Sequence, residues 1–192
     1  MLVLVPVKAF GRAKLRLADV LDGPARAALA REMADRVLTA AAPLPVAVVC
    51  DDDEVAAWAE GRGARVLWRP GLGLNGAVAD GVATLAGEGV DRVLVTHADL
   101  PLATDFDVLL NAEGIVLVPD RHEDGTNVAS IPATCGFEFA YGPGSFARHC
   151  AEAARLDLPL TVHRPPRLTW DVDVPADLDL PADIPTRPLL AC

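Results

Sequence analysis

The stretch that decides the fold is Val-Leu-Val-Thr-His-Ala-Asp-Leu-Pro-Leu, residues 93–102. Its first three residues form a short apolar run of the kind found in strands that are buried on both faces of a sheet. Pro101 cannot donate to a sheet ladder, so the strand must end before it. We therefore expect Asp99 just beyond the carboxyl end of a central strand, where open α/β sheets bind ligands. The alternative is that Asp99 caps the following helix or turn.

A second acidic site lies far downstream in Trp-Asp-Val-Asp-Val-Pro, residues 170–175. In an extended segment, residues two apart point to the same side, so Asp171 and Asp173 face one way and Val172 the other. Two like charges on one face repel each other, and Mg²⁺ relieves this because it binds carboxylate and phosphate oxygens together. If Asp99 converges with the pair, three carboxylates form a metal cradle for a nucleoside triphosphate. The alternative is a solvated acidic edge strand.

Positive charge gathers directly after the first predicted strand, residues 2–7. Lys8, Arg12, Lys14 and Arg16 place four cations within nine residues, and Lys8 and Lys14 are the only lysines among 17 basic residues. A lysine ammonium is a compact point charge that approaches phosphate from any direction. The loop therefore predicts a clamp for a triphosphate, and the alternative is a solvated loop with nonspecific basic charge.

The length of 192 residues is that of one domain, which we expect at residues 1–180, followed by an irregular, proline-containing tail at 181–192. The sequence has no apolar window of 18 residues and no signal-peptide pattern. The four cysteines lack C-x-x-C spacing, as expected of reduced thiols in a cytoplasmic protein. A net charge of −10 argues against a nucleic-acid polymer as partner, but it permits a small phosphorylated ligand. Whether the chain forms a homodimer stays open.

Strand-like and helix-like segments alternate along the chain, which predicts an α/β fold with a mostly parallel sheet. Helices are predicted at 22–41, at 77–86, from about residue 104, and up to about residue 155. Besides the central strand and the first strand, the predicted strands are 46–49, 64–68, 115–118, 128–131, 135–139 and 158–163.

Three further groups of residues are candidates for ligand binding. The glycine-rich stretch 69–76 lets backbone approach a ligand, and Asn75 there either caps the next helix or binds the nucleotide. Ser145 lies near the start of a helix, where free backbone N–H groups attract anions, and Thr126 lies in a facing turn. The alternative for Ser145 is an ordinary helix cap. His97 and His149 lack a nucleophile beside them, so we interpret them as packing or hydrogen-bonding residues near the site.

Carboxylates after later strands and lysines after the first strand fit nucleotidyl transfer, in which an acceptor attacks the α-phosphate of a nucleoside triphosphate. An acceptor that is itself a phosphate is already an anion and needs no general base, which explains the absence of a Ser-His or Cys-His set. The protein must then hold two anions in line and neutralise the developing charge.

The sequence resembles the guanylyltransferases of coenzyme F420 biosynthesis over residues 2–179, with every motif in the same order. The motifs that carry the resemblance are Val5-Pro6-Val7-Lys8, Ala13-Lys14-Leu15-Arg16-Leu17, Gly73-Leu74-Asn75, Thr96-His97-Ala98-Asp99-Leu100-Pro101, Pro119-Asp120-Arg121, Asp124-Gly125-Thr126-Asn127, Tyr141-Gly142-Pro143-Gly144-Ser145 and Asp171-Val172-Asp173-Val174-Pro175. The resemblance implies a three-layer nucleotidyltransferase fold of the glycosyltransferase-A type with a mixed, mostly parallel sheet. It also implies GTP, Mg²⁺ and a phosphorylated acceptor.

Carried over position by position, the resemblance assigns three sets of residues. Thr126, Gly142 and Ser145 would bind the acceptor, and Asp99, Asp171 and Asp173 would bind the metal. The nucleotide would contact the basic loop and the glycine-rich stretch, through Lys8, Arg12, Lys14 and Asn75. Asp99, Lys14 and Lys8 would carry the catalysis.

The resemblance leaves the acceptor open. It is phosphoenolpyruvate in the bacterial members of this family and 2-phospho-L-lactate in the archaeal ones, and some relatives accept 3-phosphoglycerate. The acidic, Ala- and Arg-rich composition favours a bacterial source and hence phosphoenolpyruvate. The competing hypotheses are another nucleotidyltransferase, for a sugar phosphate or a molybdopterin, and a nucleotide-binding module without catalysis.

Overall fold

A single mixed sheet organises the molecule, which a computed structural model describes for residues 1–110, 113–182 and 184. Strands β1 (Leu2–Pro6) and β4 (Arg92–Thr96) are parallel neighbours at its centre. Their apolar residues are buried on both faces, as the runs at residues 2–5 and 93–95 predict. The described strands follow the order β3-β2-β1-β4-β6-β5-β7. The remaining strands are β2 (Val46–Cys50), β3 (Arg65–Trp68), β5 (Ile115–Pro119), β6 (Thr126–Pro132) and β7 (Leu160–Val162).

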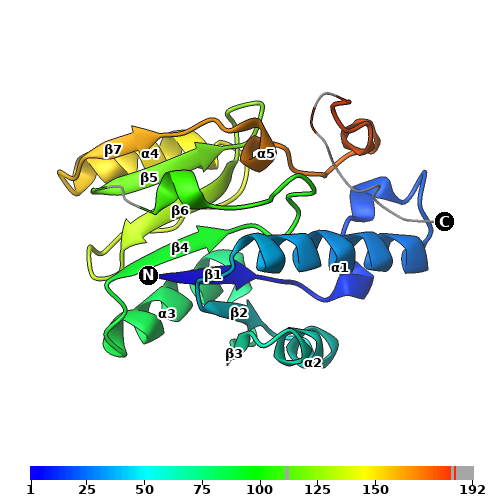
Figure 1. Ribbon diagram of the computed structural model, residues 1–192, viewed down its shortest axis with the longest axis horizontal. Helices are drawn as coiled ribbons and strands as arrows, with labels where there is room; N and C mark the ends of the chain where they lie inside the picture. The colour runs from blue at the N-terminus through cyan, green and yellow to red at the C-terminus, as the bar shows by residue number, and fades with distance from the viewer. Residues whose placement is uncertain (111–112, 183, 185–192) are drawn as a thin grey trace.

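Helices cover both faces of the sheet and complete three layers (Figure 1). On one face lie α1 (Gly23–Ala40) and α2 (Asp53–Gly61), whose apolar residues pack against alternate residues of β1 and β2. On the other face lie α3 (Gly73–Gly87) and α4 (Ser145–Arg155). The side chains of Asp22 and Asp52 accept hydrogen bonds from backbone N–H groups in the first turns of α1 and α2, so each is an N-cap.

The arrangement of the central strands creates the place for a ligand. The chain runs outward from β1 to β2 and β3 and then returns to β4 on the other side of β1, so the strand order reverses between β1 and β4. Strand β6 is antiparallel to β4, with Thr96 paired to Val128. The amino end of β6, which begins at Thr126, therefore lies at the same edge of the sheet as the carboxyl end of β4. The predicted α/β fold with a mixed, mostly parallel sheet is confirmed.

Two predicted elements are wrong. A helix was expected from about residue 104, but the structure has only the short 3-10 helix η3 (Asp107–Leu109), because Leu102, Ala103 and Phe106 enter the core from irregular backbone. The predicted strand 135–139 is irregular instead. Its alternating Phe137 and Phe139 are buried, but side chains of α4 take up N–H groups of this backbone, which therefore forms no ladder with β6.

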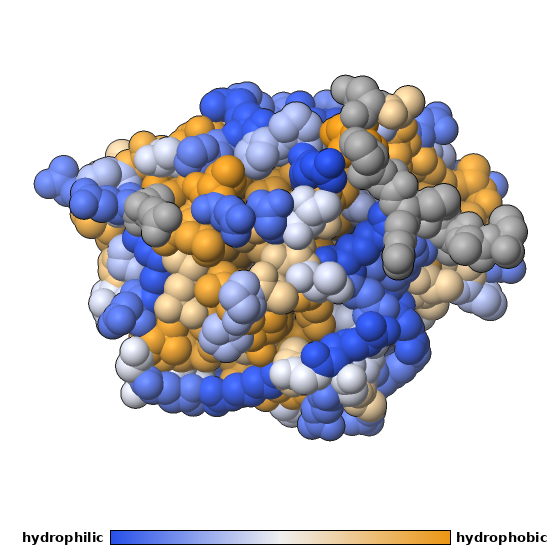
Figure 2. Space-filling model, viewed as in Figure 1, coloured by the Kyte–Doolittle hydropathy of each residue, from blue (hydrophilic) through white to orange (hydrophobic). Residues whose placement is uncertain are grey.

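The mixed polar and apolar composition of the chain is visible at its surface. Figure 2 shows hydrophilic and apolar residues interspersed over one face of the molecule. Within the described ranges, no helix has the length and apolar character that a membrane crossing requires. Most of the predicted irregular tail, residues 181–192, lies outside the described residues; of it the structure describes 181, 182 and 184.

Candidate active site

The predicted site residues meet in one cleft at the carboxyl end of β1 and β4, with a volume of about 610 Å³. These residues are far apart in the sequence, and the strand order and the loops bring them together. Among the residues that line the cleft are Lys8, Arg12, Lys14, Asp99, Thr126, Gly142, Ser145, Asp171 and Asp173. Asn75 is the one predicted site residue that does not line it.

Asp99 and Lys14 form the ion pair at the centre of the cleft. The Lys14 ammonium lies 2.6 Å from Asp99 Oδ2 and 3.1 Å from Asp173 Oδ1. Burial by itself lowers the pKa of Lys14, but the charges of Asp99 and Asp173 outweigh it and raise that pKa above its ordinary value. Burial likewise favours the neutral form of Asp99, yet the charge of Lys14 holds its pKa below the ordinary value. Both partners are therefore charged at neutral pH.

The basic loop after β1 consists of two short 3-10 helices, η1 (Phe10–Arg12) and η2 (Leu15–Leu17), with Lys14 between them. Lys14 has a left-handed backbone with φ of 53°, which turns its side chain into the cleft at some cost in strain. Lys8 and Arg12 are exposed at the cleft wall and available to an anion. The buried Leu17 fastens the loop to α1 through Leu29 and Met33.

The segment with Asp171 and Asp173 reaches the cleft by crossing the ends of the strands. Val172 is fully buried against Leu17, and its N–H donates to the carbonyl of Asp99 at 3.2 Å. The two flanking carboxylates then lie on the cleft side, as the alternating pattern predicts. Burial first, and the charges of Asp99 and Asp173 next, raise the pKa of Asp171 to about 7.

The three carboxylates are neighbours but do not form a ready-made cage. Within the described residues, no group of three or more His, Cys, Asp or Glu side chains is arranged to hold a metal ion. The Lys14 ammonium bonds to both Asp99 and Asp173. The donor set nevertheless fits a hard divalent cation, because Asp99 Oδ1 is buried without a hydrogen-bond partner among the described residues and Asp171 is held close to two like charges.

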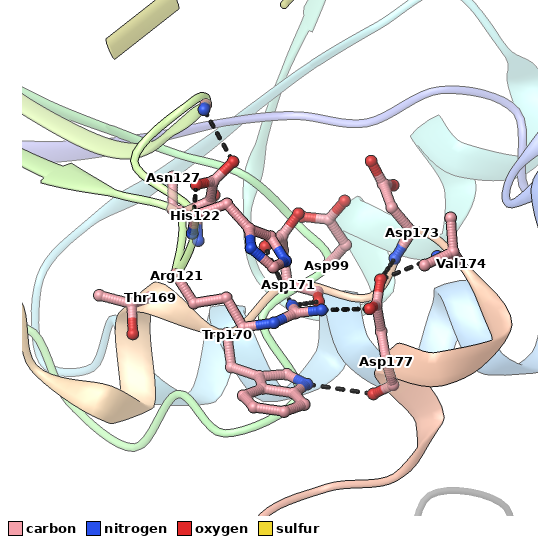
Figure 3. A network of polar contacts seen from close by, with 12 residues as sticks. Asp99, Arg121, His122, Asn127, Thr169, Trp170, Asp171, Asp173, Val174 and Asp177 are labelled. Carbon is pink, nitrogen blue, oxygen red and sulfur yellow. Dashed lines mark hydrogen bonds and ion pairs between the residues drawn. The ribbon is translucent and has the colours of Figure 1, made fainter.

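Asp177 holds the carboxylate segment in place, a role that the sequence patterns did not predict. Its buried carboxylate accepts the N–H groups of Asp173 (2.6 Å) and Val174 (2.8 Å) and an ion pair from Arg121. Arg121 in turn stacks over Trp170 at 4.3 Å and donates to the carbonyl of Asp171 (Figure 3). A signal was present, because Pro175 followed two residues later by an acid is typical of a helix start. The start here is that of the 3-10 helix η4 (Pro175–Leu178).

The opposite wall of the cleft contains Thr126, Gly142 and Ser145. Thr126 and Ser145 are both buried, whereas Gly142 is exposed in a loop and has φ of +119°, a backbone that favours glycine. Arg148 holds that loop by donating to the carbonyls of residues 140, 142 and 143. The backbone of this wall is thus fixed by a side chain of α4.

The prediction of free N–H groups at the start of α4 is wrong. The N–H of Gly144 donates to the Asp124 carboxylate at 3.0 Å, and the N–H of Phe146 donates to the Asp124 carbonyl at 3.0 Å. Ser145 donates its N–H to the carbonyl of Gly142. The turn before β6 therefore already takes up two of these N–H groups, and the Ser145 hydroxyl is a further candidate donor to an anion at this wall.

Asn75 is also placed differently from the prediction. Helix α3 begins at Gly73, so Asn75 lies in its first turn and is not its N-cap. The Asn75 amide pairs with the backbone of Tyr141, accepting at 2.7 Å and donating at 3.3 Å. This pair connects α3 to the loop of Gly142. The nucleotide contact predicted for Asn75 stays a prediction, and the structure assigns its amide a different partner.

Two buried polar groups in the cleft carry no charge. The Tyr141 hydroxyl and His97 Nε2 have no hydrogen-bond partner in the part of the chain that the structure describes, and their rings lie 4.9 Å apart. Burial lowers the pKa of His97 and raises the pKa of Tyr141, so both are neutral at physiological pH. Sequence reasoning gave no role to Tyr141, because a single tyrosine before a glycine carries no specific signal.

Comparison with known proteins gives a consistent picture. Residues 1–180 match the family described as "Guanylyl transferase CofC like". The phosphoenolpyruvate guanylyltransferase of Sphaerobacter thermophilus is 41% identical over 187 residues, which cover 93% of this chain and 90% of that protein. The corresponding protein of Rubrobacter xylanophilus is 38% identical over 184 residues, covering 91% and 90%.

A solved structure supports the fold. A protein of Desulfovibrio desulfuricans described as a nucleotide-diphospho-sugar transferase superimposes with a TM-score of 0.72 at 18% identity. The superposition covers 92% of this chain and 84% of that one. At this level of identity the likeness concerns the three-layer architecture of the sheet and helices.

Proposed function

This chain belongs to the family of CofC-like guanylyl transferases, and we propose that it transfers GMP from GTP to phosphoenolpyruvate in coenzyme F420 biosynthesis. The products are enolpyruvoyl-2-diphospho-5′-guanosine and pyrophosphate. One observation carries the proposal: a single cleft has three carboxylates and a basic loop on one side and buried hydroxyl groups on the other. Such a cleft offers binding groups both for a triphosphate with its metal and for a second, smaller anion.

Asp99, Asp171 and Asp173 would hold a divalent cation, which we propose to be Mg²⁺. The cation would supply charge neutralisation at the triphosphate. Lys14 bonds to one oxygen of Asp99 and one oxygen of Asp173, so the other oxygen of each carboxylate would be available to the cation. Lys14, Lys8 and Arg12 would supply positive charge toward the triphosphate.

The reaction joins two anions. A phosphate oxygen of phosphoenolpyruvate attacks the α-phosphorus of GTP, a new P–O bond forms, and the bond from the α-phosphorus to the bridging oxygen of pyrophosphate breaks. No proton has to be removed from the attacking group, because it is already ionised. Thr126, Gly142 and Ser145 would hold the acceptor, and Lys8, Arg12 and Lys14 would neutralise the charge that moves onto the leaving group.

The test is pyrophosphate release from GTP and Mg²⁺ with phosphoenolpyruvate, 2-phospho-L-lactate or 3-phosphoglycerate as the acceptor, and with none. We expect the highest kcat/KM with phosphoenolpyruvate and a lower value when ATP or CTP replaces GTP. If the protein prefers another acceptor, that compound would replace phosphoenolpyruvate in the proposal. Binding of GTP without pyrophosphate release from any acceptor would support a nucleotide-binding module. Location in the cytoplasm stays a prediction from the sequence.

A further inference from the structure

His149 lies on α4 behind the acceptor wall and is fully buried. Its ring is surrounded by aromatic rings, with centroid distances of 5.0 Å to Tyr141, 5.4 Å to Phe137 and 6.3 Å to Phe139. This surrounding holds the imidazole in one orientation and keeps water away from it. A histidine packed so tightly usually satisfies both ring nitrogens with protein partners.

Both ring nitrogens of His149 have such partners, and one of them fixes the tautomer. The backbone N–H of Ala140 donates to Nε2 at 2.9 Å. A backbone N–H can only donate, so Nε2 must present its lone pair and the ring proton must be on Nδ1. A doubly protonated ring would place two N–H groups against each other at Nε2. Burial and the charge of Arg148 lower the pKa of His149 to about 4, which agrees with a neutral ring.

Nδ1 of His149 lies 2.9 Å from the hydroxyl oxygen of Thr126, to which its proton is donated. Since Nδ1 donates, the Thr126 oxygen accepts, and the hydroxyl proton of Thr126 must point elsewhere. Thr126 makes no other side-chain hydrogen bond within residues 1–110, 113–182 and 184, and it lines the cleft. The hydroxyl proton is therefore left for a partner in the cleft that Thr126 lines.

We propose that His149 is a positioning residue that fixes the Thr126 hydroxyl as a hydrogen-bond donor toward the anionic acceptor. This inference rests on the proposed function. A freely rotating hydroxyl can turn either its proton or a lone pair toward a ligand, and only the proton suits a phosphate or carboxylate. The chain from Ala140 through His149 to Thr126 removes the unsuitable orientation before the acceptor binds. It sets specificity without adding positive charge to this wall.

Two substitutions separate this role from packing. In His149→Gln, the amide oxygen of the glutamine can take the position of Nε2 and still accept from the N–H of Ala140. The variant loses the N–H group that donates to Thr126. Thr126→Val keeps the shape of Thr126 and removes its hydroxyl. We expect Thr126→Val to raise the KM for phosphoenolpyruvate about tenfold, as for one lost hydrogen bond to an anion. His149→Gln should raise it severalfold, because the hydroxyl remains but is no longer held in direction, and should change the KM for GTP less than twofold. His163→Gln, outside the cleft, is the matched control.

The double variant decides the mechanism. If His149 acts through the hydroxyl, adding His149→Gln to Thr126→Val produces no further rise in the KM for phosphoenolpyruvate. Equal increases in both KM values, or effects that add in the double variant, would overturn the proposal in favour of simple packing.

Nitrogen-15 spectra of histidine-labelled wild-type protein provide a second readout that needs no turnover. One ring should stay neutral with its proton on Nδ1 down to about pH 5, and its signal should be absent from His149→Gln. A proton on Nε2 of the neutral ring assigned to His149 would overturn the proposal even if the variants fail to fold. Failure of the proposed function would appear separately, as absence of turnover of phosphoenolpyruvate by the wild-type protein.

Discussion

The two walls of the cleft are built by different physical means. On the wall of Asp99 and Lys14, these two groups of opposite charge lie 2.6 Å apart and stay ionised although both side chains are largely buried. On the wall of Thr126 and Tyr141, the buried groups are neutral and are ordered by hydrogen bonds or by packing. The charged groups of the first wall can pair with a cation and a triphosphate. The second wall offers hydrogen-bond donors of fixed direction.

The difference shows how one cleft can tell two anions apart. Cations and carboxylates attract a metal–triphosphate complex strongly, but they discriminate little by direction. Neutral donors bind more weakly, yet they reject a ligand whose acceptor atoms lie in the wrong place, because a buried donor would then stay unpaired. We therefore expect changes on the charged wall to affect turnover and changes on the neutral wall to affect acceptor affinity.

The largest effect should come from Asp99→Asn. The change removes the charge that Lys14 pairs with and a proposed metal ligand, so kcat should fall by about 10²–10³, as for the loss of one key electrostatic group. Pyrophosphate release measures it, and circular dichroism checks folding. Asp91→Asn, at the opposite end of β4, is the matched control. Retention of more than about a tenth of the activity would argue against a charged wall that drives turnover.

The second-largest expected effect is a loss of stability of the metal-free protein as the pH rises, and Asp171 is its cause. Its pKa of about 7 lies above the ordinary value of 3.8, so the folded chain binds more protons than the unfolded chain between these values. The stability that protonated Asp171 contributes is present below about pH 4 and is lost, by about a few kcal/mol, as the pH rises to 7.

Thermal unfolding in EDTA at several pH values measures this loss. Asp171→Asn should flatten the slope between about pH 4 and pH 7, and Mg²⁺ should stabilise the wild-type protein more at pH 8 than at pH 6, because it needs the ionised carboxylate. An unchanged slope in Asp171→Asn would place the titrating group elsewhere.

Ser145→Ala tests the neutral wall. The hydroxyl is proposed to donate to the acceptor, so the KM for phosphoenolpyruvate should rise about tenfold while the KM for GTP stays nearly constant. Initial rates at varied concentrations of each substrate separate the two constants. Ser130→Ala, buried in β6 outside the cleft, is the control. An equal rise in both constants would remove Ser145 from the acceptor wall.

The smallest effect is expected for Tyr141→Phe. The Tyr141 hydroxyl is buried without a partner in the described residues, so its removal should stabilise the free protein by about 1 kcal/mol and raise Tm by about 2–4 °C. The KM for phosphoenolpyruvate should rise severalfold if the acceptor supplies the missing partner. Differential scanning fluorimetry and initial rates measure the two effects. A lower Tm would mean that the hydroxyl is already satisfied.

Local patterns in the sequence were sufficient for much of this architecture. The apolar runs at residues 2–5 and 93–95 predicted the central strands, and Pro101 marked where the second one had to end. The alternation of Asp171, Val172 and Asp173 predicted which side chains face the cleft. Each of these inferences depends on neighbours within a few residues, where steric and periodic rules act directly.

The errors arose where a local pattern had a distant partner. Phe137 and Phe139 alternate as in a strand, but Glu152 and His149 of α4 bind the N–H groups of residues 138 and 140. The N–H groups at the start of α4 are free in an isolated helix, but here Asp124 caps them. Asn75 matches a helix cap in sequence, yet its amide binds a backbone 66 residues away.

The sequence by itself determined the class of fold, the edge of the sheet at which ligands bind, and the residue types that reach it. Tertiary structure alone decided which of those residues bind one another. Lys14 pairs with carboxylates 85 and 159 positions away, and the His149 tautomer depends on the backbone of Ala140 and the hydroxyl of Thr126. Strand order and loop paths bring these groups together. Local periodicity in the sequence does not specify contacts between residues that are far apart in the chain.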